Sequence, residues 1–234
     1  MRLHLPALLI AASLAAPAAG ATRNFGVTSF ERIRVDGPFK VSLATGVAPF
    51  ARATGSQSAL DGVDLTVEGK TLVVHVNRSS WGGYPGQNSG PVEISLGTHD
   101  LNAAWLNGSG SLQIDRVRGL SFDLSVQGSG SVAIAQADID QLRVNLFGTA
   151  AASIAGRAGK MTAVIRGISS LDARGLATKD ATIGAEGSAT VNATVTNSAA
   201  VDGSGPATVN LSGAPACTVR VSGSATVSGC KSAQ

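Results

Sequence analysis

The stretch "GSGSLQI" (residues 108–114) returns twenty residues later as "GSGSVAI" (residues 128–134). Both copies begin with tiny residues and continue with alternating apolar and polar side chains. When the first glycine of each similar cluster is placed in register, further copies follow at spacings of 18–20 residues. The aligned glycines are Gly108, Gly128, Gly148, Gly167, Gly187, Gly205 and Gly223. Self-similarity at a nearly fixed period indicates a chain built from equivalent structural units.

Apolar residues alternate with polar ones on both sides of most of these glycines. Leu124 and Val126 precede Gly128, for example, and Val132 and Ile134 follow it. A period of two places every second side chain on one face of a strand, so each repeat is expected to contain two strands with one face inward. A unit of about 20 residues cannot bury its own apolar face without neighbours. The sequence therefore predicts an all-β fold, a right-handed parallel β-helix (β-solenoid) with coils of about 18–20 residues.

The position two residues after each glycine is also small throughout. It is expected to lie inside the corner of a coil, where a larger side chain would clash with the coils on either side. The residues at this inner position are Gly110, Gly130, Ala150, Ser169, Ala189, Ala207 and Ala225.

Composition and charge exclude several kinds of partner. The chain has 29 glycines, only 14% charged residues, and a formal net charge of +3 at pH 7. This charge is too small to indicate binding to nucleic acid or to an anionic membrane. Abundant glycine with few helix-forming charged residues is instead typical of short strands and tight turns.

The first residues, "MRLHLPALLIAASLAAPAAGA" (1–21), have the basic start, apolar run and small-residue end of a signal peptide. We expect residues 22–234 to form a single β-helix domain without a transmembrane segment, located in the periplasm or secreted. Within it, residues 22–100 form a less regular β segment and residues 101–234 the regular coils. Cys217 and Cys230 are expected to form a disulfide, because an exported chain meets an oxidising compartment.

Catalytic and metal-binding patterns are weak in this sequence. His75 and His99 have no metal-ligand spacing around them, and no nucleophile elbow, phosphate loop or HExxH motif occurs. Asp138 and Asp140 would share a strand face, but we interpret them as solvated loop carboxylates. We therefore predict no enzymatic activity, no catalytic residue, no metal and no cofactor. A carbohydrate-active β-helix enzyme, a polysaccharide lyase or hydrolase, is the alternative, since such enzymes use this fold.

Three stretches together carry a family resemblance. They are "FERIRVDGPFKVSLATG" (30–46), "VDLTVEGKTLVVHV" (63–76) and the later Gly-Ser repeats. With this succession the chain resembles the putative auto-transporter adhesin, head GIN domain family over about residues 28–230. The resemblance implies a right-handed β-helix in an exported bacterial protein, a role in adhesion, and no known catalytic residues.

The candidate binding residues are aromatic. Trp81 and Tyr84 lie in the loop "NRSSWGGYPGQNSG" (77–90), and Phe147 is expected to point outward from a strand. These rings could stack on the sugar rings of a cell-surface glycan or pack against an envelope protein. Equally, they could cover the end of the solenoid or a loop. The sequence thus predicts an exported, non-catalytic adhesion or cell-envelope module whose partner is unknown.

Overall fold

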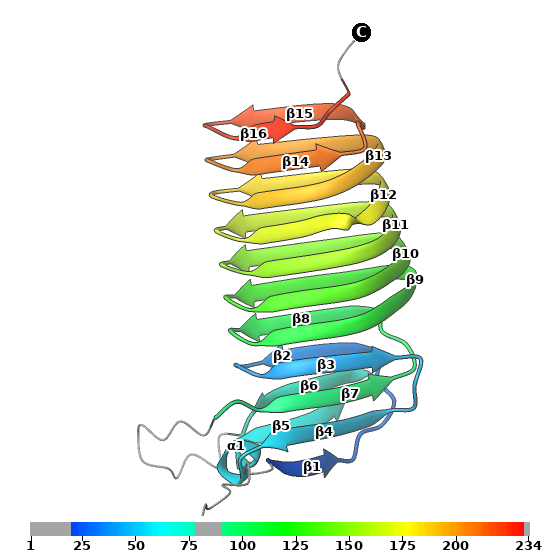
Figure 1. The fold of residues 1–234 in the computed structure, drawn as a ribbon, viewed down its shortest axis with the longest axis vertical. Coiled ribbons are helices and arrows are strands. Elements are labelled where there is room, and N and C mark those ends of the chain that lie inside the picture. Colours follow the sequence, from blue (N-terminus) through cyan, green and yellow to red (C-terminus); the bar gives the residue numbers. More distant parts are fainter. Residues whose placement is uncertain (1–19, 78–89, 232–234) are drawn as a thin grey trace, which may run out of the picture.

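The computed structural model describes residues 20–77 and 90–231. Sixteen strands form one sheet that winds into a right-handed parallel β-helix, so the predicted fold class is confirmed. Figure 1 shows the coils stacked along one axis, with β1 and α1 at one end and β15 and β16 at the other. The part of the chain that the structure describes has no helix long and apolar enough to cross a membrane.

The regular coils begin with β9 and follow the period seen in the sequence. Each long strand pairs in parallel with the next from one corner to the following one, for example from Ser111↔Ser131 to Gly128↔Gly148. The two strands expected in each repeat are therefore joined into one, because backbone pairing continues around the bend in the middle of the coil. The long strands are β9 (Ser111–Gly128), β10 (Ser131–Gly148), β11 (Ala151–Gly167), β12 (Ser170–Glu186) and β13 (Thr190–Ser204).

The core lies between the two faces of each coil. Equivalent inward positions stack in register from coil to coil. In the stack formed by the fourth residue after each repeated glycine, no residue is more than 4% exposed. Burying a side chain of the size of valine or leucine stabilises the fold by roughly 1.5–3 kcal/mol. That stack contains Leu112, Val132, Ala152, Leu171, Val191 and Val209.

The seven predicted glycines form a column at one edge of the β-helix. A Cβ atom at Gly128 would lie 2.7 Å from the carbonyl oxygen of Gly108, and one at Gly167 would lie 2.5 Å from that of Gly148. The φ angles of these two glycines are +107° and +86°, a region that other residues rarely adopt. Both the conformation and the close approach of neighbouring coils therefore require glycine at the corner.

Gly37 adds a member to this column that the aligned repeats had not included. Its backbone N–H donates to the carbonyl oxygen of Asn107 over 3.0 Å, and a Cβ atom at Gly108 would lie 3.6 Å from its nitrogen. The inner position of this coil is occupied by Phe39, which is 5% exposed. The small residue expected there is thus absent in the coil that contains Gly37.

Residues 22–100 add to the same sheet with a different chain path. The coil formed by β2 and β3 lies between the β8–β9 coil and the β6–β7 coil, although it comes first in the sequence (Figure 1). The strands beyond it pair antiparallel: β4 with β7, β1 with β4, and β5 with β6. Their bounds are β1 Ala21–Phe25, β2 Arg32–Asp36, β3 Lys40–Thr45, β4 Phe50–Gly55, β5 Val63–Glu68, β6 Thr71–Val76, β7 Glu93–Thr98 and β8 Ala103–Gly108.

A short helix, α1 (Gln57–Asp61), lies at the amino-terminal end of the stack. The side chain of Ser56 accepts a hydrogen bond from the backbone N–H of Ala59 over 3.1 Å, which caps the first turn. Leu60 is 1% exposed and packs against the core. The less regular segment therefore closes this end of the core, although the sequence analysis predicted no helix.

The carboxyl-terminal coil is shorter and more exposed. It consists of β14 (Thr208–Ser212), β15 (Ala216–Ser222) and β16 (Thr226–Ser228). Cys217 and Cys230 form the predicted disulfide, with their Cα atoms 5.7 Å apart. The disulfide joins β15 to the residues that follow β16 and so holds the last coil together.

Candidate functional site

The predicted aromatic residues do not come together in the structure. Trp81 and Tyr84 lie outside the described residues, so their role stays a prediction. Phe147 is half-buried on the outer face of β10, and the guanidinium carbon of Arg166 lies 5.9 Å from the centroid of its ring. Arg166 also forms an ion pair with Glu186 at 2.9 Å. The ring of Phe147 is thus engaged in a cation–π contact within the chain itself.

A groove on the opposite face of the coils offers a better site. It runs across β7, β3, β9, β10 and β11 on their outer side and has a volume of about 500 Å³. The side chains along it occupy equivalent outward positions on successive strands, because the coils are in register. These residues are Ser95, Ser42, Gln113, Ala133 and Ser153.

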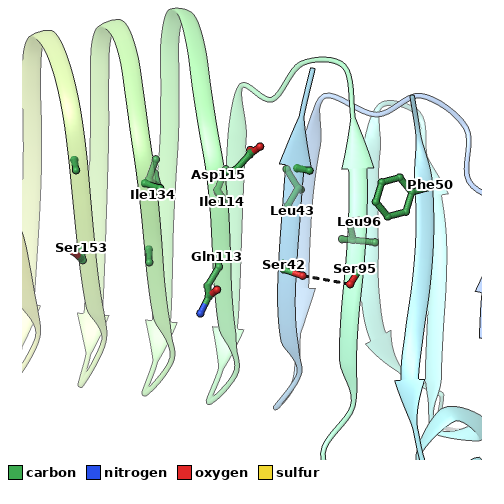
Figure 2. Close-up of a pocket in the computed structure, with 14 residues that line it drawn as sticks. Ser42, Leu43, Phe50, Ser95, Leu96, Gln113, Ile114, Asp115, Ile134 and Ser153 are labelled. Carbon is green, nitrogen blue, oxygen red and sulfur yellow. Dashed lines mark hydrogen bonds between the residues drawn. The ribbon is translucent and has the colours of Figure 1, made fainter. Parts of the chain in front are cut away.

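The floor of the groove is low because the outward residues are small. Leu43, Leu96 and Ile114 turn their side chains into the core and are at most 2% exposed. The outer surface beside them carries the hydroxymethyl groups of serines, and on β10 and β11 it continues with the methyl groups of Ala133, Ala135 and Ala155. A ligand lying here would reach almost to the backbone of the sheet, and Figure 2 shows the residues that line the groove on successive strands.

Phe50 forms the wall at the amino-terminal end of the groove. It pairs with Gly97 across β4 and β7, and it is 43% exposed. A Cβ atom at Gly97 would overlap the ring of Phe50, so the ring lies directly over the glycine. An aromatic side chain that covers a cross-strand glycine is held in one orientation. The missing side chain of Gly97 therefore fixes the ring that faces the groove.

The polar groups of the groove differ in how firmly they are held. The carboxylate oxygen Oδ1 of Asp115 accepts hydrogen bonds from the backbone N–H of Thr45 at 3.0 Å and of Arg116 at 2.5 Å. The amide of Gln113 extends from the middle of the groove and has no hydrogen-bond partner among the described residues (Figure 2). Gln113 is thus free to donate to and accept from a ligand.

Two smaller depressions lie beside the groove, nearer the starts of the strands. One, of about 220 Å³, lies beside Lys40 and Glu93. The other, of about 300 Å³, continues past Ser131 and Ser170 to Asp172. Beyond Asp172 the same outer column becomes fully polar, with Asn192 hydrogen-bonded to Asn210 and Asn210 to Ser228, both at 2.9 Å. The face therefore changes along its length from an apolar groove to a polar ladder.

The carboxylates with a shifted pKa are held in the charged form. Arg174 donates hydrogen bonds to Asp172 and lowers the pKa of that carboxyl to about 2. Arg157 contacts both oxygens of Asp138, at 2.6 and 2.9 Å, and lowers its pKa. A hydrogen bond from Ser198, aided by one from Asn197, lowers the pKa of Asp180. A general acid of a glycoside hydrolase needs the opposite shift.

The remaining titratable candidates are dispersed. The Nε2 atom of His75 lies 3.4 Å from a carboxylate oxygen of Asp64, and both side chains are partly exposed to solvent. His99 lies in the loop after β7, where its carbonyl oxygen accepts from the backbone N–H of Gly46 over 2.9 Å. Over residues 20–77 and 90–231, the structure contains no group of three potential metal ligands.

The sequence analysis missed the groove, and the reason is geometric. The residues that wall it come from β4 and from positions far apart along the chain, and β4 pairs antiparallel outside the repeat. The alternation of small outward residues at 133, 135, 153 and 155 was visible in the sequence. The pairing of Phe50 with Gly97 was not, because it depends on the register of two strands that do not follow the period.

One comparison with known proteins identifies a family for most of the chain. A family model described as putative auto-transporter adhesin, head GIN domain matches residues 29–215. A search of curated proteins finds no match to the sequence.

Several solved structures have a similar chain path. A putative adhesin from Bacteroides fragilis has a TM-score of 0.78 at 18% identity, with 90% of this chain and 97% of that one covered. A structure described as a putative lipid binding protein from Parabacteroides distasonis gives 0.71 at 16%, covering 90% and 96%. A putative adhesin from Parabacteroides merdae gives 0.63 at 16%, covering 90% and 95%. At these identities the likeness establishes the fold alone.

Proposed function

The chain belongs to the putative auto-transporter adhesin, head GIN domain family, and on that premise we propose that it is an exported, non-catalytic adhesion module. It binds a carbohydrate chain of a cell surface in the groove on the outer face of β7, β3, β9, β10 and β11. The observation that carries this proposal is the groove itself, in which a fixed aromatic ring stands at the end of a strip of small side chains.

The chemistry of the groove suits a sugar ligand. The exposed ring of Phe50 offers an apolar face on which a pyranose ring can stack. The amide of Gln113 and the hydroxyls of Ser42 and Ser95 lie where they can exchange hydrogen bonds with sugar hydroxyl groups. Neighbouring strands are about 4.8 Å apart, so the five strands present a strip of roughly 20 Å. That length accommodates several units of a chain, as adhesion requires.

The carboxylates support binding without catalysis. Glycoside hydrolysis needs a pair of carboxyl groups of which one is protonated near neutral pH. Asp115, the carboxylate that lines the main groove, accepts two backbone hydrogen bonds. The nearby Asp172 is paired with Arg174 at 2.6 Å. Among the described residues that line the main groove, Asp115 therefore has no second carboxyl group beside it, as glycoside hydrolysis would need.

Export is supported by the cysteines and by the first residues of the sequence. A disulfide such as Cys217–Cys230 persists in an oxidising compartment, which for a bacterium is the periplasm or the exterior. Residues 1–21 have the pattern of a signal peptide. We therefore place the protein in the cell envelope or outside the cell.

The test compares two exposed apolar side chains of similar size. Phe50→Ala removes the wall of the groove, whereas Leu120→Ala removes a side chain that is 78% exposed on a bend outside it. Purified protein is applied to a glycan array and to intact bacterial and epithelial cells. We expect Phe50→Ala to weaken binding by several-fold to about tenfold, the usual contribution of an aromatic contact, while Leu120→Ala binds normally.

Two further measurements test whether the protein binds lipid and whether it cleaves polysaccharides. Vesicles of phosphatidylethanolamine and phosphatidylglycerol test an acyl chain, because one relative of the same fold is described as a putative lipid binding protein. Incubation with acidic polysaccharides, followed by the release of reducing ends, tests the enzyme. If the protein bound vesicles in a way that depends on Phe50 but bound no glycan, the ligand of the groove would be a lipid and not a carbohydrate. Steady turnover of a polysaccharide would overturn the non-catalytic assignment.

The contribution of the two loop aromatic residues, Trp81 and Tyr84, is measured in the same binding experiment. A Trp81→Ala, Tyr84→Ala double variant tests whether the loop at 77–90 contributes to binding, as its composition predicts. Normal binding by this variant would leave the groove as the site and remove the loop from the proposal.

A further inference from the structure

The two ends of the β-helix differ in how their cores are closed. At the amino-terminal end, α1 and the antiparallel strands cover the core, and Phe30 and Leu60 are each 1% exposed. At the carboxyl-terminal end the last coil leaves its inward residues open: Val219 is 41% exposed and Val221 is 54% exposed. One coil earlier, the residue in register with Val219 is Val201, which is only 2% exposed.

The backbone at this end is open as well. Within the described residues, β15 pairs with β13 alone and β16 with β14 alone. Each strand therefore presents an unpaired edge of N–H and C=O groups, one on each face of the β-helix. Figure 1 shows both strands together at the end of the stack.

This edge has few of the features that normally prevent strand pairing. Protected edges carry lysines, prolines or bulges within the strand. β15 has Arg220 as its one charged residue, contains no proline, and pairs with β13 without a break in register. The disulfide between Cys217 and Cys230 ties β15 to the residues after β16, so both edges are held in position. The edge is thus regular in its pairing, apolar on its inner side and held by the disulfide.

From this geometry we infer that the carboxyl-terminal end binds the same end of a second copy of the chain. A two-fold axis perpendicular to the β-helix axis reverses strand direction, so β15 pairs antiparallel with β15 of the second copy and β16 pairs antiparallel with its equivalent. Both sheets then continue across the junction, and Val219 and Val221 are covered by the valines of the other copy.

A second copy matches this surface better than an extended peptide does. The end presents two strand edges on opposite faces with an open core between them. A single peptide strand pairs with one edge and leaves the other edge and the valines exposed, whereas the same end of another copy supplies two edges at the same separation. Arg220 points outward from the core and stays in solvent in this arrangement. Lys231, whose backbone N–H donates to the carbonyl oxygen of Pro215 at the start of β15, is exposed as well.

The test is the oligomeric state of the disulfide-bonded protein, residues 22–234. Sedimentation analysis over a range of concentrations is applied to the wild type, to Val219→Lys and, separately, to Val221→Lys. Thr182→Lys serves as the matched control, because Thr182 points outward on β12, two coils from the end. A cooperative thermal transition verifies that each variant is folded. Both positions are already more than 40% exposed, so lysine is tolerated in the monomer.

We expect a dimer for the wild type and for Thr182→Lys, and at least a tenfold increase in the dissociation constant for both valine variants. Hydrogen exchange supplies the second readout: amides of β15 should exchange more slowly in the dimer than in the monomeric variants. A wild type that stays monomeric at all concentrations would contradict the inference. So would a dimer that both valine variants leave intact, because its interface would then lie elsewhere.

Discussion

At the corner of each coil, a glycine lies against the glycine of the coil before it. The period of the sequence was enough to predict this column from Gly108 onward, because no other residue type recurs so strictly. The contribution of Gly97 is of the same kind, since the ring of Phe50 occupies the space where its side chain would be. The role of Gly97 could not be predicted from the sequence, because the sequence does not show which residue pairs with Gly97 on the neighbouring strand.

Two glycines allow the cost of a positive φ angle to be measured separately from the cost of a steric clash between neighbouring coils. At Gly167 the φ angle is +86° and a Cβ atom would lie 2.5 Å from the carbonyl oxygen of Gly148. At Gly46 the φ angle is +73°, but nothing lies within 4 Å of a Cβ atom. We expect Gly46→Ala to cost about 1 kcal/mol for the unfavourable φ alone. Gly167→Ala should cost about 1–3 kcal/mol more, because the neighbouring coils must also move apart.

Chemical denaturation of both variants measures these two costs. Equal losses of unfolding free energy would mean that the coils do not press against each other at the corner.

The ion pair of Asp172 and Arg174 makes a prediction about pH. The folded-state pKa of Asp172 is about 2, below the value of about 3.9 expected in the unfolded chain. The pair therefore stabilises the fold fully above about pH 4, and this contribution is lost as the pH falls toward 2. Because Asp172 is exposed, solvent limits the contribution to less than about 1 kcal/mol.

Denaturation of Asp172→Asn at several pH values tests this sign. The variant should be slightly less stable than the wild type at pH 7 and equal to it near pH 2, and Arg174→Gln should behave alike. A difference that grows as the pH falls would contradict the assignment.

At the scale of single elements, the regular strands and the amino-terminal segment differ in how far the sequence predicts them. Alternation of period two predicted the inward residues of β9 to β13, though not that the two strands of each coil are continuous. The coil of β2 and β3 carries the same pattern around Gly37, but it pairs on both sides with strands that come later in the chain. The repeat period of the sequence indicates neither this non-local pairing nor the capping helix α1.

The last coil makes a prediction of its own. The Cys217–Cys230 disulfide closes a loop of 13 residues and contributes about 3 kcal/mol in the chain-entropy model. Because most side chains of β15 and β16 are exposed, the loss in a Cys217→Ser, Cys230→Ser variant should be confined to these two strands. Hydrogen exchange should become faster in β15 and β16 while β9 to β12 keep their protection. Loss of protection along the whole β-helix would show instead that the disulfide holds the entire fold.

On the scale of the whole molecule, one outer face changes character from end to end. Its amino-terminal half is the groove between Phe50 and Ser153, and its carboxyl-terminal half is the ladder of Asn192, Asn210 and Ser228. From the sequence, the candidate binding contacts were placed at Trp81, Tyr84 and Phe147. The sequence could not place the groove, because a groove is a property of side chains brought together from six strands.

The claim that the groove is the binding site is tested most directly by measuring the binding of the protein to cells after a bulky side chain has been placed on the groove floor. Ala133→Arg places a long side chain in the middle of the groove from an exposed position that contributes nothing to the core. Ala200→Arg makes the same change at an exposed position of β13 outside the groove. With both variants as stable as the wild type, we expect Ala133→Arg to lower binding to cells at least tenfold and Ala200→Arg to leave it unchanged. Undiminished binding by Ala133→Arg would contradict the account, because the groove could then not be the place where this protein attaches.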